Sequence, residues 1–209
     1  KTDDGDMRMK LTMLGTGHAL ATRCYNACFA LEEEGDTAAP SGVADDSGRV
    51  FLVDAGGGSG ILSQLERAGI AYGRAHDLFL THTHIDHLLG AVWMLRVICY
   101  GMECGTYEGE LHVWGNDEVI SAADELVHML LRPSESRFIG ERVFLHAVRS
   151  GERACVMGRE TTFFDVKSKG SARQFGFVME YESGKRFACS GDEPLVQENY
   201  SFVEGAQWL

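Results

Sequence analysis

Residues 81–87 read Thr-His-Thr-His-Ile-Asp-His, and this stretch carries more information about the chain than any other. In an extended segment, side chains two residues apart point the same way, so His82 and His84 can reach one cation. Asp86 and His87 follow at the expected turn into a helix, where they can face a second cation. Neutral imidazoles and carboxylates suit zinc, and also manganese or iron. The stretch therefore predicts a centre for two metal ions.

The segments on either side alternate between strand and helix patterns. Short apolar runs bounded by turn residues are typical of buried strands, and apolar residues three and four apart are typical of helices. Asn116 is expected to cap a helix that stops near Pro133. The expected strands are 9–14, 25–31, 49–54, 77–81, 111–114, 143–148, 154–157, 161–166, 175–181 and 186–189, and the expected helices are 61–68, 88–99 and 117–131. Strands with helices outside them predict an α/β or α+β sandwich rather than a doubly wound parallel sheet.

Four further motifs occur in a familiar order around the histidine-rich stretch. They are Leu-Gly-Thr-Gly at 14–17, Val-Asp-Ala-Gly-Gly at 53–57, Gln-Phe-Gly-Phe at 174–177 and Ser-Gly-Asp at 190–192. Together the motifs resemble the metallo-β-lactamase fold superfamily of hydrolases, and its ribonuclease Z-like branch most of all. The resemblance spans nearly the whole chain, and it implies a four-layer αββα sandwich.

The resemblance also gives individual side chains a role. It implies that the metal ligands are His82 and His84 at the first ion, Asp86 and His87 at the second, and Asp192 as a bridge between them. Asp86 would also orient the nucleophile, which makes it the expected catalytic residue. Asp54 resembles the family's acidic residue that orients the metal-binding loop. By residue type alone, Asp54 and Asp192 are also compatible with ordinary turn or helix-capping aspartates.

The sequence departs from the family pattern at two places. Family members usually carry a further histidine just before the strand that holds residues 175–177, but residues 166–171 contain none. They also carry a last histidine on a strand downstream of the bridging aspartate, whereas this sequence ends at Leu209. The apolar ending Trp208-Leu209 is typical of an interrupted strand. We therefore expect the sandwich to lack its last C-terminal elements and the native chain to continue past Leu209.

These residues predict a metal-dependent hydrolase, in which a metal-bound hydroxide attacks a phosphodiester or ester-like bond of a small substrate. The resemblance implies zinc at two sites as the cofactor, with manganese or iron as alternatives. Two other functions stay open. His82, His84 and Asp192 alone could hold a single iron, as in a mononuclear dioxygenase acting on a thiol substrate. A non-catalytic metal-binding domain of the same fold is the other alternative.

Composition limits the partners and the organisation of the chain. The formal net charge of −12 repels polyanions, so tRNA is not an expected substrate, whereas a homodimer is compatible with the sequence. No signal peptide or membrane span is visible, which predicts a cytoplasmic protein.

The six cysteines are expected to be free and mostly buried. Residues 1–8 are expected to be an N-terminal extension or expression remnant, and 9–209 one domain with a flexible insertion at 32–48.

Overall fold

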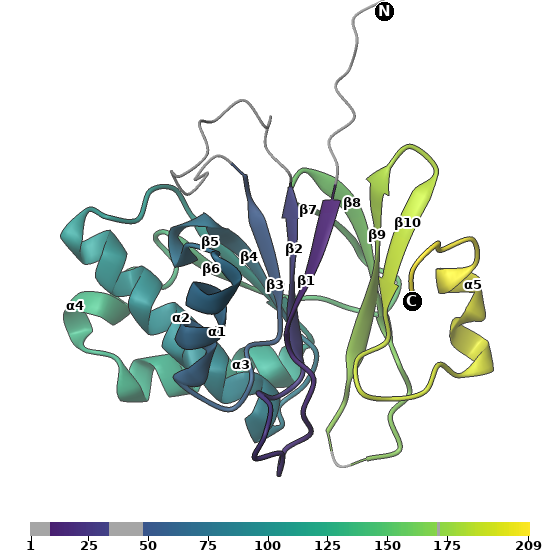
Figure 1. The fold of residues 1–209 in the computed structure, drawn as a ribbon, viewed down its shortest axis with the longest axis horizontal. Coiled ribbons are helices and arrows are strands. Elements are labelled where there is room, and N and C mark those ends of the chain that lie inside the picture. The colour runs from purple at the N-terminus through teal and green to yellow at the C-terminus, as the bar shows by residue number, and fades with distance from the viewer. Residues whose placement is uncertain (1–8, 34–47, 171) are drawn as a thin grey trace, which may run out of the picture.

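The strands of the chain form two sheets that stack face to face (Figure 1). The computed structural model describes residues 9–33, 48–170 and 172–209. Within these residues the first sheet has six strands, antiparallel from the first to the third and parallel from the third to the sixth. They are β1 (Met9–Gly15), β2 (Cys28–Glu33), β3 (Val50–Val53), β4 (Ala75–Leu80), β5 (Leu111–Gly115) and β6 (Val143–Ala147). The parallel strands place their carboxyl ends at one edge of the sheet.

The second sheet is antiparallel, with the order β10-β9-β8-β7. Its strands are β7 (Arg153–Val156), β8 (Arg159–Asp165), β9 (Phe175–Glu182) and β10 (Lys185–Cys189). Inward-facing side chains of the two sheets form an apolar core between them. In that core the ring of Phe79 lies 5.5 Å from Phe163 and 5.2 Å from Phe177, measured between centroids.

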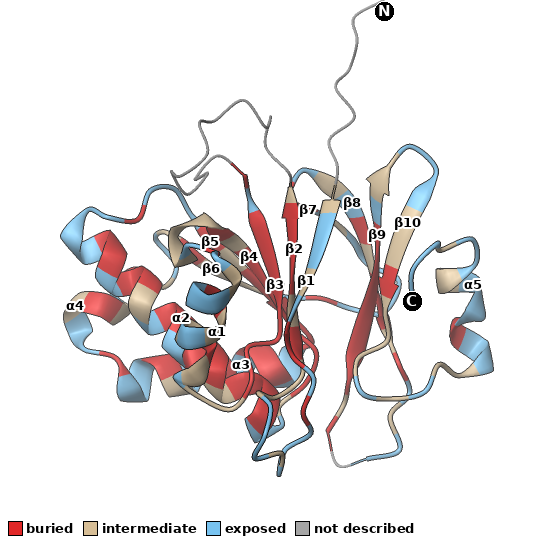
Figure 2. Ribbon diagram, viewed as in Figure 1, coloured by how far each residue is buried: buried red, intermediate tan, exposed pale blue. Residues whose placement is uncertain are grey.

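Helices cover the outer face of each sheet, and the buried residues lie on the sides that face the strands (Figure 2). The first sheet is covered by α1 (Gly60–Ala68), α2 (Ile85–Cys104), α3 (Asp117–Leu130) and α4 (Pro133–Ser136), with the 3-10 turn η1 (Tyr72–Arg74) between α1 and β4. The second sheet is covered by η2 (Gln197–Asn199) and α5 (Tyr200–Val203). Asn116 caps α3 as predicted, because its side chain accepts a hydrogen bond from the Val119 amide. The four layers confirm the predicted αββα sandwich.

Helix α2 is long and apolar enough to cross a membrane by length and composition alone. However, 67% of the stretch that meets this criterion is buried inside the protein. Its apolar side chains pack between the first sheet and the neighbouring helices. Among the described residues, α2 therefore has the burial of a core helix.

The predicted flexible insertion at 32–48 was wrong at its start. Glu32 and Glu33 complete β2, and Glu32 is buried although its pattern indicates a solvated loop. Its carboxylate accepts from Thr12 at 2.9 Å and forms ion pairs with Lys10 at 3.1 Å and Arg74 at 3.3 Å. These partners offset the cost of removing the charge from water. Most of the remaining insertion (34–47) and the predicted extension at 1–8 lie outside the described residues.

The cysteines are free, as predicted, but the prediction that most of them are buried was wrong. Cys28 and Cys99 are buried, whereas Cys24, Cys104 and Cys155 are exposed. The exposed ones lie in the loop after β1, at the last residue of α2 and on β7, the edge strand of the second sheet. Loops, helix ends and sheet edges keep contact with solvent even where the residue type favours burial.

Candidate metal centre

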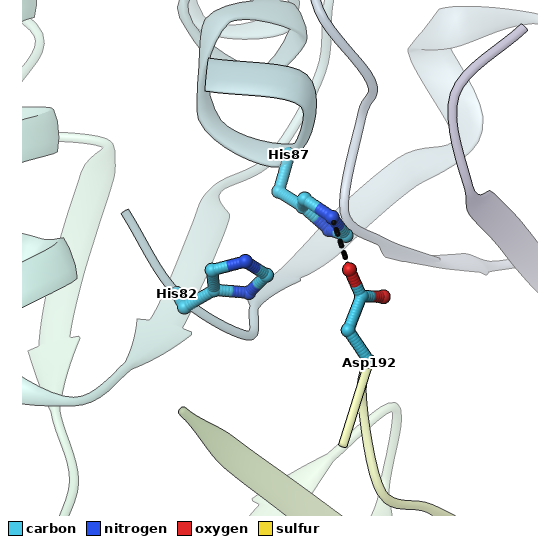
Figure 3. A group of neighbouring side chains, drawn as sticks. All are labelled: His82, His87 and Asp192. Atoms are coloured by element: carbon cyan, nitrogen blue, oxygen red, sulfur yellow. Dashed lines mark ion pairs between the residues drawn. The ribbon is translucent and has the colours of Figure 1, made fainter. Parts of the chain in front are cut away.

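The histidine-rich stretch lies at the carboxyl end of β4 and continues into the first turn of α2. His84 is the last extended residue before the helix, with φ −63° and ψ 148°. Asp86 and His87 belong to the first helical turn. Asp192 reaches the same place from the second sheet, three residues after the end of β10. Figure 3 shows His82, His87 and Asp192 around one space, contributed by two segments far apart in sequence.

The nitrogen and oxygen atoms of these side chains converge. Nε2 of His82 lies 2.8 Å from Nδ1 of His84. Nε2 of His87 lies 3.0 Å from Oδ2 of Asp192 and 3.6 Å from Oδ2 of Asp86. One ligand atom each from His82, His87 and Asp192 lies within 4.8 Å of the others. Five side chains predicted as metal ligands are therefore gathered at one place.

The Asp54 carboxylate contacts Thr81 and His87 on the side away from the converging ligand atoms. Oδ1 accepts from the backbone amide of Thr81 at 2.9 Å, and Oδ2 accepts from the Thr81 hydroxyl at 2.8 Å. Nδ1 of His87 also lies 2.8 Å from Oδ2. Since the Thr81 hydroxyl gives its single proton to Asp54, its oxygen accepts from Nδ1 of His82 at 2.8 Å. Both histidine rings are thus oriented with Nε2 toward the centre.

The local backbone explains how Asp54 reaches this position. Strands β3 and β4 are parallel neighbours, so the residues that follow them, Asp54 and Thr81, emerge side by side. Asp54 has a positive φ of 54°, a conformation that non-glycine residues rarely adopt. The turn after it fits against α2, where the amide of Gly90 donates to the Gly56 carbonyl at 2.7 Å. The strained turn is held in place by contacts on both sides.

The electrostatics of the two buried histidines differ. Burial, together with the nearby His87, lowers the pKa of His82 to about 4, so the ring is neutral at pH 7. Burial acts in the same direction on His87, but hydrogen bonds to Asp192 and Asp54 outweigh it and raise its pKa to about 10. The contact with His87 in turn lowers the pKa of Asp192. A proton on Nε2 of His87 thus compensates the negative charge of the Asp192 carboxylate beside it.

The donor set fits a metal ion. Neutral imidazole nitrogens and carboxylate oxygens are the ligands that zinc and similar cations take in proteins. Nε2 of His82 and Nδ1 of His84 face each other, as two ligands of one cation do. A cation beside Nε2 of His87 would take over the charge that the proton carries next to Asp192.

The segment before β9, where the family pattern has a further histidine, also lies at this edge. The Phe175 amide donates to the Thr81 carbonyl at 2.9 Å, and Ser168 donates to Glu193 at 2.9 Å. Gln174 is buried, and its Oε1 has no partner among the described residues. Sequence reasoning placed Gln174 and Thr81 inside motifs but gave neither side chain a role. For Thr81, a hydroxyl residue directly before the first histidine of the motif is the signal that could have found it.

Comparisons with known proteins identify similar sequences and similar folds. Residues 9–108 match the family model described as Anti-Pycsar protein Apyc1. The chain is 26% identical over 181 residues to Ribonuclease Z of Haloferax volcanii, which covers 86% of this chain. It spans about half of that relative, 49% of its length.

The architecture is similar to that of the metallo-beta-lactamase fold protein YhfI from Bacillus subtilis. The TM-score is 0.68 at 18% identity, and the match covers 95% of this chain and 69% of YhfI. The chain has the metallo-β-lactamase fold. The short form of human tRNase Z shares this fold with a TM-score of 0.63 at 17% identity, over 95% of this chain and 75% of the human one. The expected metallo-β-lactamase fold is thereby confirmed, and the expected resemblance to ribonuclease Z agrees with the similarity to the Haloferax protein.

Proposed function

We propose that this protein is a metal-dependent hydrolase that cuts phosphodiester or ester-like bonds of a small substrate, with zinc at two sites. The observation that supports it best is the convergence of His82, Asp86, His87 and Asp192 at the meeting edge of the two sheets. Similarity to a ribonuclease Z favours a phosphodiester over other esters, because ribonucleases cut the phosphodiester bonds of RNA.

Each side chain has a proposed role in holding the ions. His82 and His84 would hold the first ion, Asp86 and His87 the second, and Asp192 would bridge the two. Bound zinc supplies positive charge that polarises a phosphoryl oxygen and lowers the pKa of water. Asp54 and Thr81 keep both Nε2 atoms turned toward the ions, so the ligands need little rearrangement on binding.

Asp86 is the proposed catalytic residue. Its carboxylate lies in the first turn of α2, 3.6 Å from Nε2 of His87, with its side chain almost fully buried. A carboxylate at that place can accept a proton from an attacking water and keep the water oriented toward the bond that is cut. Ile85, next to it, is 63% exposed and offers an apolar contact for the rest of the substrate.

The charge of the protein supports a small substrate. A net charge of −12 disfavours a long polyanion such as tRNA, which binds mainly through neutralised phosphates. A short substrate with one or two charges meets much less repulsion. The names ribonuclease Z and tRNase Z describe what those two proteins do. The smaller substrate is proposed for this chain on the basis of its own charge.

The test is metal content together with hydrolysis. Protein purified without chelator is analysed for metals and assayed on bis(p-nitrophenyl) phosphate, before and after treatment with EDTA and after addition of zinc. We expect two equivalents of metal, loss of activity with EDTA and recovery with zinc. His82→Ala and Asp192→Ala should each lower kcat/KM at least about 100-fold, because each removes a ligand of the proposed ions.

His128→Ala is the matched control, since His128 lies exposed on α3, where it pairs with Asp124. It should hydrolyse the substrate like the unchanged protein. Two bound metals with no hydrolysis of any phosphodiester or ester tested would overturn the proposal. A single iron with uptake of O₂ would also overturn it, in favour of the mononuclear dioxygenase.

A further inference from the structure

The Gln174 side chain is buried without a hydrogen-bond partner for its carbonyl oxygen. Only 3% of the residue is exposed, and Oε1 accepts no hydrogen bond from the described residues. The other buried side-chain atoms in this condition are nitrogens of Arg159 and Arg173, and both arginines still pair with carboxylates. Within residues 9–33, 48–170 and 172–209, Gln174 therefore carries the one buried side-chain acceptor that lacks a donor.

Packing and stability do not explain an amide at this position. Side chains alternate along a strand, so residues 174, 176 and 178 share the outer face of β9, where Val178 and Ala188 belong to an apolar cluster. A buried acceptor without a donor destabilises a fold, whereas an apolar side chain of the same size does not. Oε1 of Gln174 therefore lowers the stability of the fold and forms no hydrogen bond that would offset the loss.

The oxygen lies against the turn that carries Asp192. A Cβ added to Gly191 would lie 3.4 Å from Oε1 of Gln174 and 3.6 Å from Cβ of Thr81. Gly191 directly precedes Asp192, the proposed bridging ligand, and has a positive φ of 67°. Thr81 in turn orients His82 through its hydroxyl. Oε1 is thus placed beside the supports of two proposed ligands.

Asp192 is less enclosed than the proposed ligands on α2. Its side chain is 45% exposed, whereas those of His87 and Asp86 are 2% and 10% exposed. His87 and Asp86 belong to the first turn of a long helix, but Asp192 lies in a loop after β10. A hydrogen bond to the turn around Asp192 would therefore restrict this ligand more than it would restrict a helical one.

We propose that Gln174 is a positioning residue for Asp192. Its Oε1 accepts a hydrogen bond from a backbone amide of the turn at residues 190–193 when Asp192 binds the proposed metal ions, and this holds the turn in the ligating position. Because the Cβ position of Gly191 is only 3.4 Å from Oε1, the amides on either side of the Gly191 Cα reach the oxygen after a small shift of the turn. Glycine has no Cβ that would block this approach. The inference rests on the proposed function, since it assigns a support to the same metal centre.

The test compares zinc affinity with the stability of the metal-free protein. Gln174→Met keeps the length of the side chain and removes the acceptor. Its urea midpoint after treatment with EDTA should be unchanged or higher, because Oε1 has no partner to lose. Its zinc affinity, measured by competition with a chromophoric chelator, should fall about tenfold, as it does when other groups that orient ligands are lost. Unchanged zinc affinity, or a fall in the metal-free midpoint, would overturn the inference.

Gln174→Glu is the rescue variant, because its carboxylate keeps an acceptor at the same distance from the backbone. We expect its zinc affinity to stay near that of the unchanged protein. Its metal-free midpoint should fall, since a buried charge without a partner is unfavourable. A zinc affinity as low as that of Gln174→Met would contradict the role of the oxygen as an acceptor.

Asn199→Leu is the matched control. Asn199 is also buried, but its amide donates to the Asp165 carbonyl at 2.9 Å. Its loss should lower the metal-free midpoint and leave the zinc affinity of the folded protein unchanged. If the unchanged protein binds two zinc ions and hydrolyses bis(p-nitrophenyl) phosphate while Gln174→Met keeps its zinc affinity, the role of Gln174 is refuted and the proposed function is not. An unchanged protein that binds no zinc refutes both.

Discussion

Nδ1 of His87 lies 2.8 Å from Oδ2 of Asp54, which ties the first turn of α2 to the end of β3. The same carboxylate accepts two hydrogen bonds from Thr81, at the end of β4. One buried side chain thus fixes the position of three segments. Because Asp54 touches a proposed ligand on the side away from the centre, its contribution can be separated from ligation itself.

Asp54→Asn should weaken zinc binding about 10- to 100-fold, the usual cost of losing the partner of a ligating histidine. Asparagine tolerates the positive φ at this position, so the turn is preserved. Competition with a chromophoric chelator measures the affinity. Asp77→Asn is the control, because Asp77 is also buried but accepts from the Trp114 indole at 2.9 Å. It should lower stability and leave zinc affinity unchanged; equal losses in both variants would contradict the role of Asp54.

Thr81→Val should weaken zinc binding and lower stability, although its side chain has nearly the same shape. The change leaves Nδ1 of His82 without its acceptor, and an unsatisfied buried donor costs about 1–3 kcal/mol. Thr81→Ser keeps the hydroxyl and should restore zinc affinity to nearly its original value. Urea unfolding and chelator competition are measured on both variants. Identical zinc affinities for the two would show that the hydroxyl does not position His82.

Gly90→Ala should destabilise the protein by about 3 kcal/mol or prevent folding, because overpacking against backbone is poorly relieved. A Cβ at Gly90 would overlap the carbonyl oxygen of Ala55, where α2 meets the turn after β3. Gly58→Ala is the control, since a Cβ there meets no atom within 4 Å. Denaturant midpoints of the two variants provide the comparison. The proposed fit between helix and turn is wrong if both variants are equally stable.

The lowered pKa of His146 should make the free energy of unfolding depend on pH. Burial lowers its pKa, His112 lowers it further, and Asp77 acts in the opposite sense. The unfolded chain therefore binds a proton more readily than the folded protein does. The contribution of His146 to the free energy of unfolding is therefore fully present above the ordinary histidine pKa of about 6.5, and it is lost as the pH falls below that value.

His146→Phe keeps the stacking on Trp114 and removes the titration. Between pH 7.5 and pH 5.5, the urea midpoint of the unchanged protein should fall further than that of the variant. His128→Ala, at an exposed position, should follow the unchanged protein. A variant that loses as much stability as the unchanged protein would rule out this role for His146.

Much of the fold is predictable from local patterns. The strands expected at 9–14 and 143–148 agree with β1 and β6 to within one residue, because apolar alternation and turn residues act over short distances. The location of β2 was less accurate, since it begins at Cys28 and includes Glu32. Local pattern does not reveal that distant residues will pair with a glutamate. Helix α4 was also missed, because Pro133 was interpreted only as a stop and not as the first residue of a new helix.

The candidate site also has one part that the sequence predicts and one part that depends on how the chain folds. His82, His84, Asp86 and His87 are adjacent in sequence, so their spacing alone predicts a metal centre. Asp192 could be assigned only through family resemblance, because its approach to His87 depends on how the two sheets pack.

The contact between His87 and Asp192 also bears on when the protein becomes competent during folding. The two residues belong to elements of different sheets, so they meet only when the second sheet is docked on the first. Neither half of the sandwich holds the complete group of donors by itself. A chain in which the two sheets have not docked therefore lacks Asp192 among the proposed ligands, so the complete donor group forms only when the two halves have assembled.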